Sequence, residues 1–366
     1  MNIILTGVTG TLGSQILLEL LKNETIEKFT LLIRDKKNLS AQQRFQRIIE
    51  NDFFSTQTRI LSNLKQRVQV FNSDEFFNPS KYLLEEENNY FIHSAGYVNL
   101  STDISQKELI FEENFSFAKK IFKTFHFYIK KFTYISTAFA IGDIGGKIEN
   151  NYHNNTTPNY RNAYEESKHK TEKHLLKQGH KNNVQIQILR PSVIGGNIIN
   201  KPINYISKYM VYYLVGKFFY KNPLLEKNGI RLSVNFKSGL NIIPVDYVAK
   251  VITIVFLKNI QELNIVHNKC TNLVTGLTRI IETVGYKQFS FLDNVSTHNI
   301  QNMNKLEKFY YSSIGNHLSP YTSSKPYEFN TKKLEGILPL PQYNLEDYLE
   351  QTIIYAMENN FRNEKW

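Results

Sequence analysis

The sequence predicts an α/β protein with a doubly wound, mainly parallel sheet and a smaller lobe formed by its C-terminal third. Three observations support this fold class. Short apolar segments alternate with helical segments over the first 190 residues, a glycine-rich turn joins the first strand to the first helix, and the alternation fades after Arg190-Pro191. Parallel sheets with helices on both faces produce this alternation, and their strands read as continuous apolar runs.

The strands and helices of the first 190 residues follow from local patterns. Apolar, β-branched runs predict six buried strands at 2–6, 29–33, 68–71, 90–93, 132–136 and 184–189. Apolar residues at helical spacing predict helices at 12–22 and 40–51, a long helical stretch is expected at about 106–128, and 162–175 is expected to be a helix with charges on most faces and few apolar residues.

The C-terminal third is less regular. It contains an aromatic-rich segment predicted as a helix over 203–221, a strand and a helix over 241–257 with Asp246 as the helix cap, a short strand at 264–267, a helix at 277–285 closed by Gly285, and a last helix at 345–361. We expect residues 1–200 to form the main domain, which about 240–270 rejoins. The lobe then comprises 201–240 and 271–366.

Composition limits the functional classes. The 366 residues are 41% hydrophobic, which suffices for a large core, and the net charge is +11. Because the basic residues are scattered and form no long block, no nucleic-acid partner is expected. The oligomeric state stays open.

The single cysteine, Cys270, excludes an internal disulfide and fits a reducing compartment. The N-terminus has no basic region ahead of its apolar run, and no apolar run reaches the roughly 20 residues that span a bilayer. We therefore expect a cytoplasmic protein.

The glycine-rich turn has the sequence TGVTGTLG, with Gly7, Gly10 and Gly13 between the first strand and the first helix. Glycines here allow a tight turn and let the backbone approach a pyrophosphate, while the helix N-terminus attracts its charge. This predicts a Rossmann-like dinucleotide site. The cofactor contacts expected from the turn are Gly7, Thr9, Gly10, Thr11, Leu12 and Gly13.

The end of the second strand indicates which dinucleotide binds. An acidic residue there favours NAD, whereas an arginine pairs with the 2′-phosphate of NADP. The strand ends in Arg34, followed by Asp35, so NADP(H) is favoured and NAD(H) remains the alternative. Arg44 is either a second phosphate contact or a solvated helix residue.

Further cofactor contacts are expected at the ends of the other strands. Asp74, after the third strand, can bond the adenine amino group, and small residues after the fourth strand let the backbone run close to the cofactor. The complete additional set is Asp74, Ser94, Ala95, Gly96, Asn114, Pro191, Ser192 and Val193.

The fifth strand ends in Ser136 and Thr137, and the next helix carries Tyr164 and, one turn later, Lys168. Ligands of doubly wound sheets lie at these strand ends, so the four side chains can converge on one crevice. We expect the Lys168 ammonium to lower the pKa of the Tyr164 phenol, which suits a general acid. The opposite helix face, with Glu172 and Lys173, is expected to be solvated. These groups suit proton transfer paired with hydride transfer from a nicotinamide.

These motifs resemble the extended short-chain dehydrogenase/reductase superfamily, and within it the fatty acyl-CoA reductases and thioester reductase domains with a male-sterility-type NAD(P)-binding domain. The likeness covers about residues 1–260. It rests on LLIRDKKNLSAQQRFQRI, which is similar to that branch's strand arginine and helical insertion, on STAFAIG, on YEESKHKTE and on LNIIPVDYVAKVI.

The resemblance implies roles for individual residues. The family's catalytic hydroxyl lies five residues before the strand-turn glycine, here Gly142, which selects Thr137 with Ser136 as the alternative. Tyr164 becomes the general acid, and Lys168 tunes it and binds a ribose of the cofactor. The sequence departs from the family at Ser73-Asp74, where the family has Gly-Asp, and at 93–96, where His-Ser-Ala-Gly replaces its HxAA.

The implied activity is NADPH-dependent reduction of a fatty acyl thioester to an aldehyde or alcohol, in lipid metabolism. The acyl group is then expected on a separate CoA or acyl carrier protein. Three alternatives stay open: an epimerase or dehydratase acting on a nucleotide sugar, a hydroxysteroid-like dehydrogenase acting on an alcohol or ketone, and a non-catalytic NADP-sensing regulator.

Three other features have alternative interpretations. His93 is expected to be a core histidine. His267 and Cys270 are close in sequence, but two candidate ligands do not make a zinc site, so no metal is expected. The aromatic stretch 205–220 suits an acyl tunnel, a peripheral contact with a membrane surface, or plain lobe core.

Overall fold

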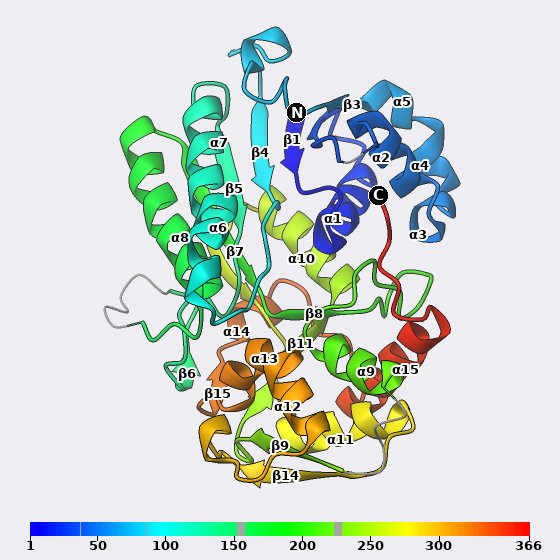
Figure 1. Cartoon of the computed structure of the whole chain (residues 1–366). Coiled ribbons are helices and arrows are strands. Elements are labelled where there is room, and N and C mark those ends of the chain that lie inside the picture. The colour runs from blue at the N-terminus through cyan, green and yellow to red at the C-terminus, as the bar shows by residue number, and fades with distance from the viewer. Residues whose placement is uncertain (37, 86, 152–157, 223–228) are drawn as a thin grey trace.

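The computed structural model describes the chain except residues 37, 86, 152–157 and 223–228, and except the side chain of 298. Its centre is a parallel sheet of seven strands in the order β12-β7-β5-β4-β1-β2-β3 (Figure 1). The strands are β1 (Asn2–Thr6), β2 (Lys28–Leu32), β3 (Val68–Phe71), β4 (Asn89–His93), β5 (Lys131–Ile135), β7 (Gln185–Pro191) and β12 (Glu262–Ile265). The doubly wound fold is confirmed.

Helices cover both faces of this sheet. The principal ones are α1 (Thr11–Leu21), α2 (Ala41–Ile49), α6 (Lys107–Phe111), α7 (Phe117–Phe125), α8 (Ala163–Asn182) and α10 (Val245–Leu257). Buried residues of α1 and α10 share one core cluster, whereas α7 and α8 pack on the other face (Figure 1). The short helices α3 (Asp52–Ser55), α4 (Thr58–Ser62) and α5 (Leu64–Arg67) lead into β3.

The predicted helix over 106–128 is interrupted. A 3₁₀ turn, η2 (Ile104–Gln106), precedes α6, and a π-helical turn, η3 (Glu112–Ser116), separates α6 from α7. The π turn contains the buried Asn114. Such turns insert an extra residue into a helix and often mark functional sites.

The chain returns to the sheet through β11 (Ile242–Pro244), α10 and β12. Asp246 does not cap α10 as expected, since the N-cap is Pro244 without a side-chain bond. The Asp246 carboxylate instead accepts backbone N–H groups of residues 198, 199, 200 and 247. It therefore fixes the loop that enters the lobe.

The lobe has its own hydrophobic core. Its helices are α9 (Tyr212–Lys221), α11 (Leu273–Thr283), α12 (Lys305–Ser312), α13 (Ile314–Thr322) and α15 (Leu345–Glu358). Short strand pairs complete it and join it to the main domain: β9 (Ile230–Val234) with β14 (Phe289–Asp293), β10 (Gly239–Leu240) with β13 (Thr271–Asn272), β8 (Val193–Gly195) with β11, and β6 (Gly146–Ile148) with β15 (Tyr327–Phe329). The remaining short elements are η1 (Pro79–Lys81), η5 (Thr297–Asn299) and α14 (Lys332–Glu335).

The predicted helix over 203–221 is wrong in its first half, because only α9 is helical. Residues 205–209 instead run toward α1 and find other partners for their backbone groups. The Ser207 carbonyl accepts the Glu364 N–H at 2.8 Å, and the Tyr209 N–H donates to Asn363 at 2.8 Å. Most aromatic rings of the whole segment 203–221 are buried in the hydrophobic core of the lobe.

No helix among the described residues is long and apolar enough to cross a bilayer.

A buried ion pair corrects the expectation for the outer face of α8. Lys173 is exposed as expected, but Glu172 is 0% exposed. Its carboxylate accepts hydrogen bonds from Arg190 at 2.7–3.1 Å, and the same guanidinium contacts Glu262 at 3.0 Å. Arg190 on β7 is fully buried, and burying an unpaired charge is very unfavourable. Glu172 is therefore drawn inward.

We expect Glu172→Gln to destabilise the protein by about 3 kcal/mol, because it leaves Arg190 buried with only part of its compensating charge. Urea unfolding measures the loss. Lys173→Gln, on the next residue of the same helix, is the matched control and should change stability by less than about 0.5 kcal/mol. Equal stability of the two variants would contradict this assignment.

Candidate active site

A cavity of about 410 Å³ opens between the sheet and the lobe. It lies at the carboxyl ends of β1, β4, β5 and β7, where ligands of such sheets bind. The main domain lines it with residues 10–13, 94, 96–98, 100, 135–137, 139, 164, 168 and 191–194, and the lobe with Ile206, Lys208, Met210, Val211 and Tyr321. The predicted residues Ser136, Thr137, Tyr164 and Lys168 are thus brought together.

The glycine loop leaves no room for side chains at two positions. A Cβ on Gly7, whose φ is +80°, would lie 2.4 Å from the Ala95 nitrogen. A Cβ on Gly13 would lie 2.1 Å from the Gly7 carbonyl oxygen. The loop is closed by a 2.8 Å bond from the Gly10 N–H to the same carbonyl.

Helix α1 begins directly after this loop, without a side-chain cap on Gly10. Its first residues, Thr11, Leu12 and Gly13, line the cavity. An uncapped helix N-terminus with small residues in front of it is suited to a pyrophosphate. The residues present therefore fit a dinucleotide.

Two hydroxyls at the end of β5 face the cavity. Thr137 Oγ1 accepts the Phe139 N–H at 3.3 Å, which leaves its own proton available for a ligand. Ser136 is 5% exposed, and its Oγ has no hydrogen-bond partner within the described part of the chain. A buried hydroxyl without a partner is unfavourable. Both side chains are therefore ready to bond a substrate oxygen.

Lys168 is fixed to the strand that carries these hydroxyls. Its Nζ donates to the Ile135 carbonyl at 2.7 Å and lies 4.3 Å from the centre of the Tyr134 ring. Burial lowers the pKa of Lys168 to about 7.

The pKa of Tyr164 is shifted in the direction opposite to the expectation. Burial, and secondly the Glu165 carboxylate, raise the pKa of the Tyr164 phenol. Lys168 does not lower it, because the ammonium is itself desolvated and is turned to the Ile135 carbonyl. Tyr164 therefore keeps its proton at neutral pH in this state.

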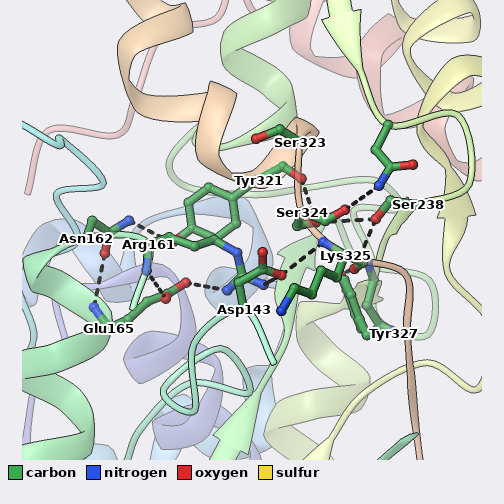
Figure 2. A network of polar contacts seen from close by, with 12 residues as sticks. Asp143, Arg161, Asn162, Glu165, Ser238, Tyr321, Ser323, Ser324, Lys325 and Tyr327 are labelled. Carbon is green, nitrogen blue, oxygen red and sulfur yellow. Dashed lines mark hydrogen bonds and ion pairs between the residues drawn. The ribbon is translucent and has the colours of Figure 1, made fainter. Parts of the chain in front are cut away.

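A polar network fixes the N-terminus of α8 to the lobe (Figure 2). Asn162 caps the helix by accepting the Glu165 N–H at 3.1 Å, and its amide donates to the Tyr321 hydroxyl at 2.9 Å. Arg161 bonds Glu165 at 2.8 Å and Asp143 at 3.4 Å. The Tyr321 side chain thus forms part of the cavity wall and is held next to Tyr164's helix. The sequence contains no local signal for Tyr321, because its position depends on how the lobe docks.

Asn114 has a supporting position behind the cavity. The π turn directs its amide to residue 97, where it accepts the Tyr97 N–H at 2.9 Å and donates to the Tyr97 carbonyl at 3.0 Å. It fixes the loop after β4 and is not among the cavity-lining residues of the described chain. Ser94, Gly96, Pro191, Ser192 and Val193 do line the cavity, and Ala95 contacts Gly7.

The three residues predicted to lie near the adenosine of the cofactor have different surroundings. Arg34 is 59% exposed and pairs with Glu113 at 3.3 Å. Arg44 is buried and donates to the carbonyls of Arg34 and Trp366, so it is not a solvated helix residue. Asp74 is exposed and lies outside the described cavity lining.

Thr9 also has a defined partner. Its carbonyl accepts the indole N–H of Trp366 at 3.0 Å.

The histidines and the cysteine have structural surroundings. His93 is buried, bonds Thr6 Oγ1 at 2.8 Å and stacks on Tyr134, and burial and Lys168 lower its pKa to about 3. His267 contacts Lys269, while Cys270 Sγ lies 3.7 Å from the Tyr327 carbonyl. No group of three candidate metal ligands occurs among the described residues.

Comparison with solved structures finds chains of similar fold. The terminal R domain of the myxalamid PKS-NRPS pathway is 17% identical with a TM-score of 0.69, over 99% of this chain and 92% of that one. The thiolation-reductase di-domain of an archaeal non-ribosomal peptide synthetase is 19% identical with a TM-score of 0.64, over 99% and 76%. UDP-glucuronic acid 4-epimerase from Bacillus cereus, in complex with NAD, is 17% identical with a TM-score of 0.63, over 98% and 97%.

These likenesses show a shared fold. A search of curated proteins found no significant match. A family model described as male sterility protein, an NAD-binding domain, matches residues 5–252, which is well over half of the chain. The chain therefore belongs to the male sterility protein family of NAD-binding domains.

Proposed function

We propose that this protein reduces an acyl thioester to an aldehyde with NADPH. The observation that carries the proposal is the apolar wall above the catalytic groups. This wall consists of Val98, Leu100, Phe139, Ile194, Ile206, Met210, Val211 and Tyr321. The only charged side chains among the described lining residues are Lys168 and Lys208. An apolar wall suits a hydrocarbon chain, whereas sugar hydroxyls require polar partners.

The chain's own residues supply the groups that such a reduction needs. NADPH, when bound, supplies a hydride to the carbonyl carbon. Thr137 and Tyr164 donate hydrogen bonds to the carbonyl oxygen, which becomes negatively charged as the carbon turns tetrahedral. Tyr164 is protonated before the reaction, because burial keeps its pKa high. Ser136 is a second donor for the same oxygen.

The tetrahedral oxyanion then collapses. The carbon–sulfur bond breaks, the aldehyde forms, and the thiolate leaves with the bond's electron pair and takes a proton from solvent. Stabilising the oxyanion in a water-poor cleft lowers the barrier to the step that forms it. The thiolate belongs to CoA or to a carrier protein, and the thiolation-reductase neighbour makes a carrier-bound acyl group a reasonable second substrate to test.

Two features favour NADPH over NADH. Arg34 follows β2 at the position that reads the adenosine ribose, and its side chain, 59% exposed, forms a weak surface ion pair with Glu113 that a phosphate can replace. Asp35, which would favour NAD, is already engaged, because its Oδ1 accepts the Ala41 N–H at 2.6 Å. The Asp35 carboxylate, which would accept hydrogen bonds from the two ribose hydroxyls of NAD, therefore already bonds the first residue of helix α2.

Tyr164→Phe should lower kcat for long-chain acyl-CoA reduction by roughly 10²–10³-fold, because a hydrogen-bond donor to the oxyanion is lost. The affinity for NADPH should stay within about threefold. Loss of NADPH absorbance with acyl-CoA measures the first quantity, and a fluorescence titration measures the second.

Tyr160→Phe is the control for this substitution. It removes a phenol that lies four residues earlier, bonds His169 and is outside the described cavity lining. Conversion of a UDP-sugar without any consumption of acyl-CoA or acyl carrier protein would overturn the thioester proposal. Full activity of Tyr164→Phe would remove Tyr164 from the mechanism.

Arg34→Ala should weaken NADPH binding by roughly tenfold or more and leave NADH binding nearly unchanged, because only NADPH carries the 2′-phosphate. Titrations with both cofactors give the ratio. Asp35→Asn is the companion variant and should not alter that ratio. A loss of NADH affinity equal to that of NADPH in Arg34→Ala would contradict the assignment.

A further inference from the structure

Lys208 is a cation in the cofactor cleft that comes from the substrate lobe. It is part-buried and lines the same cavity as the glycine loop residues 10–13. Among the described residues no carboxylate forms an ion pair with it. An ammonium group that is partly desolvated and has no anionic partner is unfavourable unless a ligand supplies the charge.

The charges around Lys208 strengthen this argument. Burial lowers the pKa of Lys208, and so do the neighbouring positive charges of Lys36 and Arg44. Lys36 and Arg44 do not line the cavity, and the Asp35 carboxylate offsets part of the charge of Arg44. The net positive potential at Lys208 therefore favours an anion in the part of the cavity that Lys208 lines.

The backbone on both sides of Lys208 is held in place. Ser207 Oγ lies 2.9 Å from Thr11 Oγ1, at the first residue of α1. The C-terminal segment 361–366 contacts the other side of this stretch. The Glu364 N–H donates to the Ser207 carbonyl at 2.8 Å, and the Tyr209 N–H donates to Asn363 Oδ1 at 2.8 Å. Lys208 is thus positioned by its neighbours at the end of the helix where a pyrophosphate is expected.

The same C-terminal segment also holds the glycine loop. It rises from α15 to α1 (Figure 1). Trp366, 5% exposed, donates its indole N–H to the Thr9 carbonyl at 3.0 Å, and its own carbonyl accepts from Arg44 at 3.1 Å. Segment 361–366 therefore contacts both the glycine loop and the backbone beside Lys208, and it fixes their relative positions.

We propose that Lys208 binds the pyrophosphate of the dinucleotide and thereby couples the lobe to the cofactor. The pyrophosphate is favoured over the 2′-phosphate for a geometric reason. Lys208 lines the cavity with the glycine loop and is bonded through Ser207 to the start of α1, whereas Arg34 lies at the end of β2 and outside the described lining. The proposal rests on dinucleotide binding and not on the acyl substrate.

Lys208→Met tests the proposal through binding alone. Fluorescence titrations with NADPH and with NADH, without any thioester, should show both dissociation constants raised by roughly 10- to 100-fold, because both cofactors contain the pyrophosphate. Lys208→Arg should retain most of the affinity. Lys221→Met, an exposed lysine in α9, is the matched control and should bind as the unmodified protein does.

A salt series gives an independent measurement. The logarithm of the NADH dissociation constant should depend less steeply on the logarithm of salt concentration in Lys208→Met, since one cationic contact is missing. Lys208→Gln repeats both measurements if the methionine variant does not fold. Unchanged affinity for both cofactors would overturn the proposal. A loss confined to NADPH would also overturn it, because the contact would then be with the 2′-phosphate.

Hydrogen exchange tests the coupling of the lobe to the cofactor. Bound NADPH should slow amide exchange in residues 205–211 of the unmodified protein, and less so in Lys208→Met at equal cofactor occupancy. Equal protection in both proteins would show that Lys208 does not couple the lobe to the cofactor. None of these measurements uses an acyl thioester, so failure of the proposed reaction would leave their outcome interpretable.

Discussion

The hydrogen bond from the Lys168 ammonium to the Ile135 carbonyl fixes the position of helix α8 relative to strand β5 in the active site. An ammonium buried at 3% exposure requires an acceptor, and the last carbonyl of β5 provides it at 2.7 Å. This bond joins helix α8 to the strand end that carries Ser136 and Thr137. Tyr164, one turn earlier on the helix, is consequently placed over the same crevice as the two hydroxyls. The glycine loop and the lobe complete a site whose centre this single contact defines.

The lobe is fixed to the main domain on two sides of that centre. At the start of α8, Arg161, Asn162 and Glu165 form a buried network that reaches Tyr321. At the start of α1, Ser207 bonds Thr11. Because both contacts involve the first residues of the helices that form the site, movement of the lobe would directly alter the cleft. The lobe is thus part of the site's geometry as well as its cover.

The sequence predicted what depends on local pattern. Buried strands have an apolar signal of their own, and the glycines at 7 and 13 are required by backbone contacts that any nucleotide loop of this kind makes. The first half of the helix predicted over 203–221 is wrong because the Ser207 carbonyl and the Tyr209 N–H bond residues more than 150 positions away. Glu172 is expected in solvent from the pattern of its own helix, because its partner Arg190 belongs to strand β7. Tyr321 and Lys208 enter the cleft only through docking of the lobe, which no local pattern encodes.

Desolvation is the main influence on the pKa values of Lys168 and Tyr164 at the centre of the site. Burial lowers the pKa of Lys168 to about 7 and raises that of Tyr164, so near neutral pH both groups are shifted toward their uncharged forms. For the proposed reduction this is a useful starting condition, because a phenol that holds its proton can donate a hydrogen bond to a developing oxyanion. The proposed oxyanion would supply the negative charge that the site lacks, and its formation favours the charged form of Lys168. In the proposed reaction the lysine would therefore act most strongly after the substrate carbon has begun to change, which is when stabilisation lowers the barrier.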